Sequence, residues 1–170
     1  MGIKVFGVIF ILVGCGGFGF KLASAHKREE GSLRVLIRML DYMECELQYR
    51  LTPLPSLCRQ AAIDGNGTLK KVFCKLANCL EDHINPNVDQ CMKEAMRCIT
   101  DIPPITKSEL ELLGASLGRF DIDGQLKGLE FVRQDCKRNL NELADNRDVR
   151  VRSYQTLGLC AGAALAILLI

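Results

Sequence analysis

Apolar residues gather at the two ends of the chain, and the segment between them alternates apolar and polar positions with a helical period. The first apolar run covers residues 5–20, and the second, residues 154–170, contains no charged residue. An uncharged run of about 17 residues approaches the shortest helix that crosses a bilayer. The pattern therefore predicts an N-terminal transmembrane helix (1–25), a helical domain (26–152) and a C-terminal transmembrane helix (153–170).

Basic residues flank both apolar runs on the side of the central domain. Lys4 alone precedes the first run, whereas the inner flanks carry several cations: Lys21, Lys27, Arg28, Arg147, Arg150 and Arg152. Lys and Arg collect on the cytoplasmic side of membrane helices. We therefore expect the central domain to face the cytoplasm.

A lipid anchor is the alternative for the first run. Residues 12–15, Leu-Val-Gly-Cys, match the pattern of a bacterial lipoprotein cleavage site, in which Cys15 would carry the lipid. Against this, only Lys4 supplies a basic start, and the apolar run continues past Cys15 to Phe20. The alternative would make the chain an envelope protein with a binding role.

The central domain is predicted to be all-α, an antiparallel bundle of about six helices flanked by the two transmembrane helices. The seam Leu33, Leu36, Leu40, Met43 and Leu47 steps by three and four residues, which is typical of a helix packed in a bundle. No segment alternates with the period of a strand. The expected helices are residues 32–50, 52–63, 68–82, 88–100, 106–117 and 125–152, the last continuing into the C-terminal span.

Several polar residues and glycines have the positions of helix caps. We expect Thr52 to cap the second helix, Asn87 the fourth and Asp121 the last. Thr106-Lys107-Ser108-Glu109 has the spacing of a capping box, in which each end side chain satisfies a free amide. Gly118 suits a left-handed helix end.

Composition gives no support to enzymatic or nucleic-acid function. Net charge is +2, with basic and acidic residues interleaved, so nucleic acid is not an expected partner. The nine cysteines include no Cys-x-x-Cys pair, and two scattered histidines are too few for a Cys/His metal site. Asp121, Asp123 and Glu130 are most simply a solvated helix start. We therefore predict no catalytic residue, no cofactor and no metal site.

Three sequence blocks carry a resemblance to a known family. Residues 44–54 (Glu-Cys-Glu-Leu-Gln-Tyr-Arg-Leu-Thr-Pro-Leu), residues 113–125 (beginning Leu-Gly-Ala-Ser-Leu-Gly) and residues 152–158 (Arg-Ser-Tyr-Gln-Thr-Leu-Gly) resemble blocks of the stage III sporulation protein AB family. The resemblance spans essentially the whole chain. The residues that match the family motifs are Glu46, Thr52, Pro53, Leu54, Gly114, Leu117, Gly118, Asp121, Gln125, Arg152, Tyr154, Leu157 and Gly158.

The resemblance implies a non-enzymatic component of the mother-cell membrane, in the channel or secretion-like complex that joins mother cell and forespore. Its soluble domain would be similar to the cytoplasmic domain of the type II secretion F protein. The implied partners are membrane lipid, a secretion-type ATPase and other proteins of the stage III A complex. On the residues alone, the chain is expected to be a membrane-held helical adaptor or an oligomeric component, which includes a homo-oligomer.

Small residues recur in the C-terminal apolar run. Gly158, Gly162 and Ala166 are four residues apart, so they share one helix face. Small residues at this spacing let two membrane helices approach closely. The candidate partners are the first span, a second copy or another subunit, while small residues are also simply common in membrane helices.

Overall fold

The computed structural model contains six helices in its described part. It describes the backbone of residues 2–82, 87–118 and 121–169, and the side chains of residues 25–82, 87–118 and 121–145. No strand occurs in these ranges, which confirms the all-α prediction. The helices are α1 (Gly2–Arg50), α2 (Leu54–Asp64), α3 (Gly67–Glu81), α4 (Val88–Arg97), α5 (Pro104–Ser116) and α6 (Ile122–Leu169).

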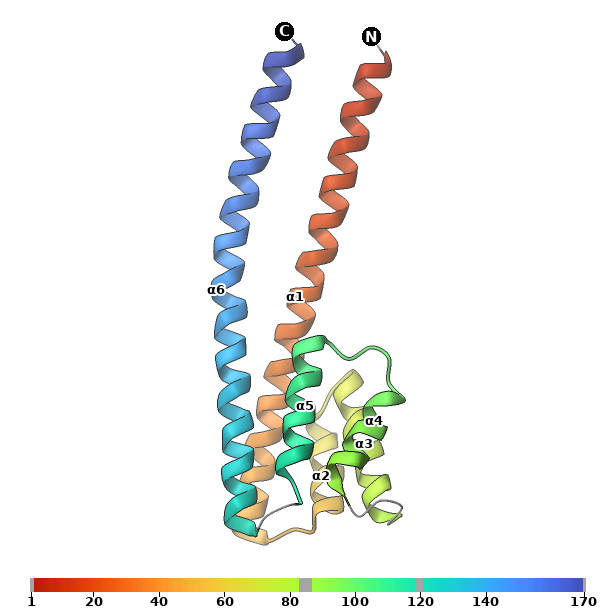
Figure 1. Ribbon diagram of the computed structural model, residues 1–170, viewed down its shortest axis with the longest axis vertical. Coiled ribbons are helices and arrows are strands. Elements are labelled where there is room, and N and C mark those ends of the chain that lie inside the picture. Colours follow the sequence, from red (N-terminus) through yellow and green to blue (C-terminus); the bar gives the residue numbers. More distant parts are fainter. Residues whose placement is uncertain (1, 83–86, 119–120, 170) are drawn as a thin grey trace.

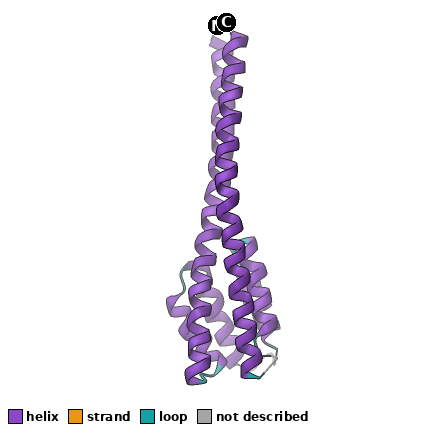
Figure 2. Cartoon of the chain, turned by 90° about the vertical axis from the view of Figure 1, so that its left-hand side faces the viewer, coloured by secondary structure: helices purple, strands orange, loops and turns teal. Residues whose placement is uncertain are grey.

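Two long helices frame four short ones. Successive helices run in opposite directions, and α1 and α6 extend far beyond α2–α5 so that both chain ends lie at the same end of the molecule (Figures 1 and 2). The helices α1 and α6 have 49 and 48 residues and pack against each other. Each helix also packs against the next one along the chain, and α1 contacts α3 and α5 as well.

The predicted separation between a terminal helix and the first helix of the bundle is wrong. A single helix, α1, replaces the predicted helices 1–25 and 32–50. Gly31, which lies between the two predicted ranges, is an exposed residue of this continuous helix, and a Cβ added to it would meet nothing within 4 Å. At the other end the prediction is confirmed, because α6 continues without a break to Leu169.

The predicted membrane spans involve residues whose side chains are not described. Apart from Ala25, residues 1–25 and 153–170 lie outside the side-chain description, and only the helical course of the backbone of residues 2–24 and 153–169 is given. Of the residues that the structure does describe, none forms a helix that is both long and apolar enough to cross a membrane.

The core follows the predicted apolar stripes. In α1, Leu33, Leu36, Leu40 and Met43 have no exposed surface, and Leu47 is 4% exposed. Opposite them, the stripe of α6 buries Leu129, Val132 and Cys136, and it half-buries Leu126, Leu140 and Leu143. Phe73 of α3 is the largest fully buried side chain. Burial of a Leu or Phe side chain contributes roughly 1.5–3 kcal/mol, so this common core holds the six helices together.

Prolines and polar caps set the helix boundaries. The prolines of the described part are confined to links and first helical turns, where no backbone amide donor is lost: Pro53, Pro55, Pro103 and Pro104. Two predicted caps are confirmed. The Asn87 side chain accepts a hydrogen bond from the Asp89 amide at 3.1 Å, and the Asp121 carboxylate accepts one from the Gly124 amide at 3.1 Å.

The predicted capping box is wrong. Helix α5 begins at Pro104, preceded by Pro103, so Thr106 and Glu109 lie inside the helix and are buried. The proline ring favours the first helical turn and moves the start of the helix ahead of the threonine. Both side chains turn instead to the long helices, Thr106 to α1 and Glu109 to α6.

Candidate functional site

Two of the three motif blocks meet at one end of the bundle. Residues 44–54 cover the link from α1 to α2, and residues 113–125 cover the link from α5 to α6. Both links lie at the end of the molecule opposite the chain termini (Figures 1 and 2). Antiparallel packing of α1 against α6 brings together blocks that are about 70 residues apart in the sequence.

The first block forms the turn between α1 and α2, and side-chain contacts hold this turn in place. Leu51, directly after α1, has a φ of 53°, a left-handed conformation that is unfavourable for a leucine. The Thr52 hydroxyl donates a hydrogen bond to Glu46 Oε2 at 3.1 Å, and Arg50 Nη1 lies 3.3 Å from Glu46 Oε1. The buried Glu46 carboxylate therefore fastens the chain on both sides of the strained leucine.

Thr52 does not cap α2 as predicted. Its hydroxyl is engaged by Glu46, and no side chain caps the first turn of α2. Pro53 takes the N-cap position, and its carbonyl accepts the first intrahelical bond, from the Leu57 amide at 2.9 Å. The motif residues Glu46, Thr52 and Pro53 thus act together to turn the chain.

The second block is a closely packed helix end. A Cβ on Gly114 would lie 2.8 Å from the Cβ of Met92, so α5 touches α4 there without room for a side chain. Gly118 has a φ of 77°, and a Cβ on it would overlap Cγ2 of Val88. Leu117, between them, is 1% exposed. Gly114 therefore serves the packing of α5 against α4, and Gly118 has the left-handed conformation expected for it.

Exposed apolar and acidic side chains lie around these two corners. Tyr49 is 76% exposed, Leu51 62% and Ile122 45%. Asp121 and Asp123, on either side of Ile122, are exposed as well. We call these five residues, Tyr49, Leu51, Asp121, Ile122 and Asp123, the apex. Apolar side chains rimmed by polar ones mark protein interaction surfaces more often than chemistry.

Charged contacts fix the long helices to each other near the apex. Arg133 of α6 lies 3.0 Å from Asp41 and 3.5 Å from Glu44, both on α1, and 3.0 Å from Glu130 on its own helix. The hydrogen bond from Gln134, followed by that from Arg133, lowers the pKa of the Glu130 carboxyl. Glu130 is therefore part of an ion-pair network.

Polar contacts of α5 connect it to both long helices. Glu29 Oε1 accepts hydrogen bonds from the Thr106 amide and hydroxyl, at 2.8 and 3.1 Å. Glu109 Oε1 accepts one from Asn139 at 2.6 Å. Burial, and then the nearby Asp135 carboxylate, raise the pKa of the Glu109 carboxyl above its usual range. Sequence spacing gave no sign of these contacts, because their partners lie on distant helices.

Some of the remaining predicted site residues have side chains that the structure describes, and the others lie outside the described side chains. Leu54 is half-buried against the core, and Gln125 lies in the first turns of α6. The third motif block, with Arg152, Tyr154, Leu157 and Gly158, lies outside the described side chains, as do Cys15, Gly162 and Ala166. Within the described residues, no group of three His, Cys, Asp or Glu side chains could hold a metal ion.

Comparisons with known proteins agree on one family. The model of the family described as Stage III sporulation protein AB matches residues 4–170. A protein of Bacillus subtilis (strain 168) described as Stage III sporulation protein AB is 24% identical over 170 residues, covering 98% of this chain and 99% of that protein. A solved structure of a Stage III sporulation protein AB has a TM-score of 0.61 and 18% identity, covering 72% of this chain and 98% of that one. At that identity the structural likeness supports the fold alone.

Proposed function

Since the chain belongs to the stage III sporulation protein AB family, we propose that it is a non-enzymatic platform of a sporulation membrane complex. In this proposal α1 and α6 anchor the chain in the mother-cell membrane that faces the forespore. The bundle projects into the cytoplasm, where it docks a secretion-type ATPase and contacts other proteins of the stage III A complex.

One observation carries this proposal: the apex lies at the far end of the bundle from the predicted anchors. The motif residues Glu46 and Thr52 hold Leu51 in a left-handed conformation with its side chain 62% exposed. A strained backbone that presents an apolar side chain to solvent is costly, and such strain concentrates at functional sites. The adjacent Asp121 and Asp123 supply negative charge, which favours a partner with basic residues around an apolar pocket.

A binding experiment with one apex variant tests the docking role. Leu51→Asn removes the apolar side chain, and asparagine tolerates the left-handed conformation better than leucine, so the fold should be kept. We expect the purified full-length chain to bind the ATPase and Leu51→Asn to weaken that binding at least tenfold. Ile63→Asn is the matched control, because Ile63 is 72% exposed but lies at the other end of α2.

The possible results separate the docking role from its alternatives. Equal loss of binding in both variants would point to a general effect on folding or solubility. Unchanged binding in Leu51→Asn would exclude the apex as the docking surface. No binding by the unmodified chain would remove the ATPase from the proposal.

The membrane orientation needs a separate test. An engineered cysteine at residues 85–87, where the sequence Asn-Pro-Asn is typical of an exposed turn, should resist an impermeant thiol reagent in intact protoplasts and react after lysis, in a chain whose native cysteines are replaced. Rapid labelling of intact protoplasts would reverse the orientation. Mass spectrometry of Cys15 tests the lipid-anchored alternative, which requires a diacylglycerol adduct and the loss of residues 1–14.

A further inference from the structure

Cysteines are concentrated on the neighbouring helices α3 and α4. Cys74 and Cys79 lie on α3, Cys91 lies on α4, and Cys98 follows directly after it. The Sγ atoms of Cys79 and Cys91 are 2.7 Å apart, and both residues are in the reduced, thiol form. A disulfide bond is about 2.05 Å long. The fold therefore holds two sulfurs, 12 residues apart in the chain, almost within bonding distance.

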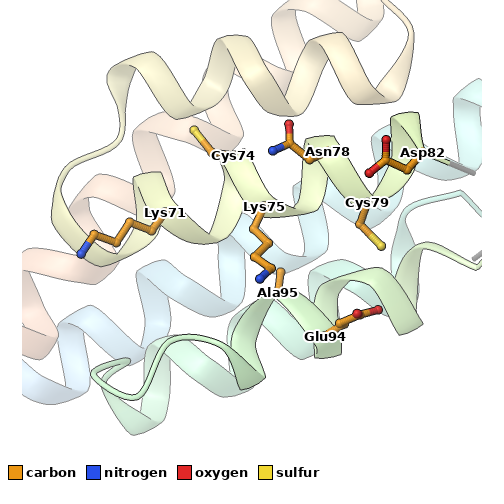
Figure 3. Close-up of a pocket in the computed structure, with 8 residues that line it drawn as sticks. All are labelled: Lys71, Cys74, Lys75, Asn78, Cys79, Asp82, Glu94 and Ala95. Atoms are coloured by element: carbon orange, nitrogen blue, oxygen red, sulfur yellow. The ribbon is translucent and has the colours of Figure 1, made fainter. Parts of the chain in front are cut away.

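The two thiols differ in access. Cys91 has no exposed surface, whereas Cys79 is half-buried. Cys79 helps to line an open hollow of about 460 Å³ between α3 and α4, and its side chain points toward α4 (Figure 3). The charged residues of the hollow are Lys71, Lys75, Asp82 and Glu94. The two cations and two carboxylates balance, so the hollow carries no net charge.

We infer that Cys79 and Cys91 form an oxidisable thiol pair, which hydrogen peroxide converts into an intramolecular disulfide joining α3 to α4. In the first step the Cys79 sulfur, after losing its proton, attacks one peroxide oxygen. The O–O bond breaks, Cys79 becomes a sulfenic acid, and the other oxygen leaves as hydroxide. In the second step the Cys91 sulfur displaces the sulfenic oxygen, which leaves as water with the Cys91 proton. Two thiols lose two electrons, and one peroxide becomes two waters.

The difference in burial between Cys79 and Cys91 sets the order of these two steps. Burial, followed by the hydrogen bond to Cys79, raises the pKa of the Cys91 thiol to about 12. Cys91 is therefore protonated at neutral pH and shielded from solvent, so it does not meet the oxidant first. Cys79, which faces the hollow, is the attacking group, and Cys91 resolves the sulfenic acid. A resolving thiol next to an accessible one is typical of reversible cysteine oxidation.

Peptide mapping of the full-length chain in detergent tests this inference. The reduced protein is exposed to hydrogen peroxide, its remaining thiols are alkylated, and disulfide-linked peptides are identified by mass spectrometry. We expect the Cys79–Cys91 link as the main product, the loss of two alkylatable thiols, and reversal by dithiothreitol. The link should form at least tenfold faster in the folded protein than in urea, because the fold supplies the proximity.

Single variants separate this pair from the other cysteines. Cys74→Ser is the matched control, since Cys74 lies on the same helix and lines the same hollow but points to the other side of α3 (Figure 3). It should keep the link, and Cys79→Ser should abolish it. Cys91→Ser should leave Cys79 as a sulfenic acid that dimedone traps. A different main link, equal rates with and without urea, or no thiol loss in the unmodified chain would each overturn the inference.

Discussion

The Glu29 carboxylate caps a helix to which it does not belong. One of its oxygens accepts hydrogen bonds from the amide and the hydroxyl of Thr106, 77 positions further along the chain. Thr106 is the third residue of α5, so its amide is one of the donors that a helix start leaves without an intrahelical acceptor. The negative charge also lies at the positive end of the α5 dipole. A residue of α1 thus fixes where α5 begins.

Replacement of Glu29 by Ala should lower the stability of the chain. The change leaves a buried amide and hydroxyl without their acceptor, and we expect a loss of about 1–3 kcal/mol in the free energy of unfolding. Denaturant unfolding of the full-length chain measures it. Glu30→Ala is the control, because Glu30 only forms an exposed i,i+4 pair with Arg34 and should change stability by less than about 0.5 kcal/mol. Equal effects would show that Glu29 is not a cap.

Two helical glycines should respond to alanine with opposite signs. Gly114→Ala would place a Cβ 2.8 Å from the Cβ of Met92, which cannot move unless α4 moves. We expect it to destabilise the chain by about 1–3 kcal/mol. Gly31→Ala meets nothing within 4 Å and should stabilise α1 by roughly 0.5–1 kcal/mol. Thermal unfolding of both variants checks the pair, and a shift in the same direction would refute the close packing.

Gly118→Ala should cost more than Gly67→Ala. Both glycines have positive φ values, 77° and 54°, so alanine is strained at each by about 1 kcal/mol. At Gly67 the added Cβ meets nothing, whereas at Gly118 it overlaps the Val88 side chain. The difference in unfolding free energy between the two variants isolates this contact. The double variant Gly118→Ala with Val88→Ala should show less than the sum of its parts, and full additivity would argue against direct contact.

Glu109→Gln should gain stability relative to the unmodified chain as the pH rises from about 4 to 7. Because the folded pKa of Glu109 is raised, the folded state binds more protons than the unfolded state in this window. Its contribution is complete below the usual pKa of a glutamate and is lost as the pH rises through the folded value. Asp135 and Cys136 are the titratable neighbours, and the Cys136 pKa is itself raised well above neutrality.

Unfolding measurements at several pH values test the Glu109 prediction. The control is Glu111→Gln, an exposed residue on the same helix, which should differ from the unmodified chain by a constant amount. A pH-independent difference for Glu109→Gln would contradict the prediction.

The C-terminal half of α6 carries one prediction about membrane packing. Gly162→Ile should weaken association of this helix in a membrane two-hybrid assay and impair sporulation, because it fills the face made by Gly158, Gly162 and Ala166. Leu165→Ile lies largely off that face and should do neither. If the two variants behave alike in both assays, the small-residue face is not an interface.

The local pattern was enough to locate the helices of the bundle but not all of their ends. The stripe from Leu33 to Leu47 and the prolines at 53 and 103 correctly placed the core face and two links, since both signals act within a few residues. The prediction of separate helices at 1–25 and 32–50 was wrong, since α1 is continuous from Gly2 to Arg50, and the one glycine between the two ranges, Gly31, costs a helix only about 1 kcal/mol.

Contacts between distant helices could not be predicted from spacing. Thr106 and Glu109 fit a capping box, but Pro103 and Pro104 had already started the helix, and the buried partners Glu29 and Asn139 decided the role of each side chain. Likewise, threonine is a residue type that often caps helices, but the Thr52 hydroxyl donates its hydrogen bond to Glu46 instead. The closeness of Cys79 to Cys91 depends on how α3 packs against α4. It could not be predicted from the sequence, because the two cysteines do not have a Cys-x-x-Cys spacing.

The unbroken course of α6 has a mechanical consequence. A helix of 48 residues is about 70 Å long, and it contains no proline at which it would bend. The same helix begins at the apex and ends beside the chain terminus, and the Arg133 network clamps it to α1. We therefore expect α1 and α6 to move together as one rigid body. A tilt or rotation imposed at the terminal ends of α1 and α6 is then transmitted to Leu51 and Ile122, and a partner that displaces the apex also displaces the terminal ends of both helices.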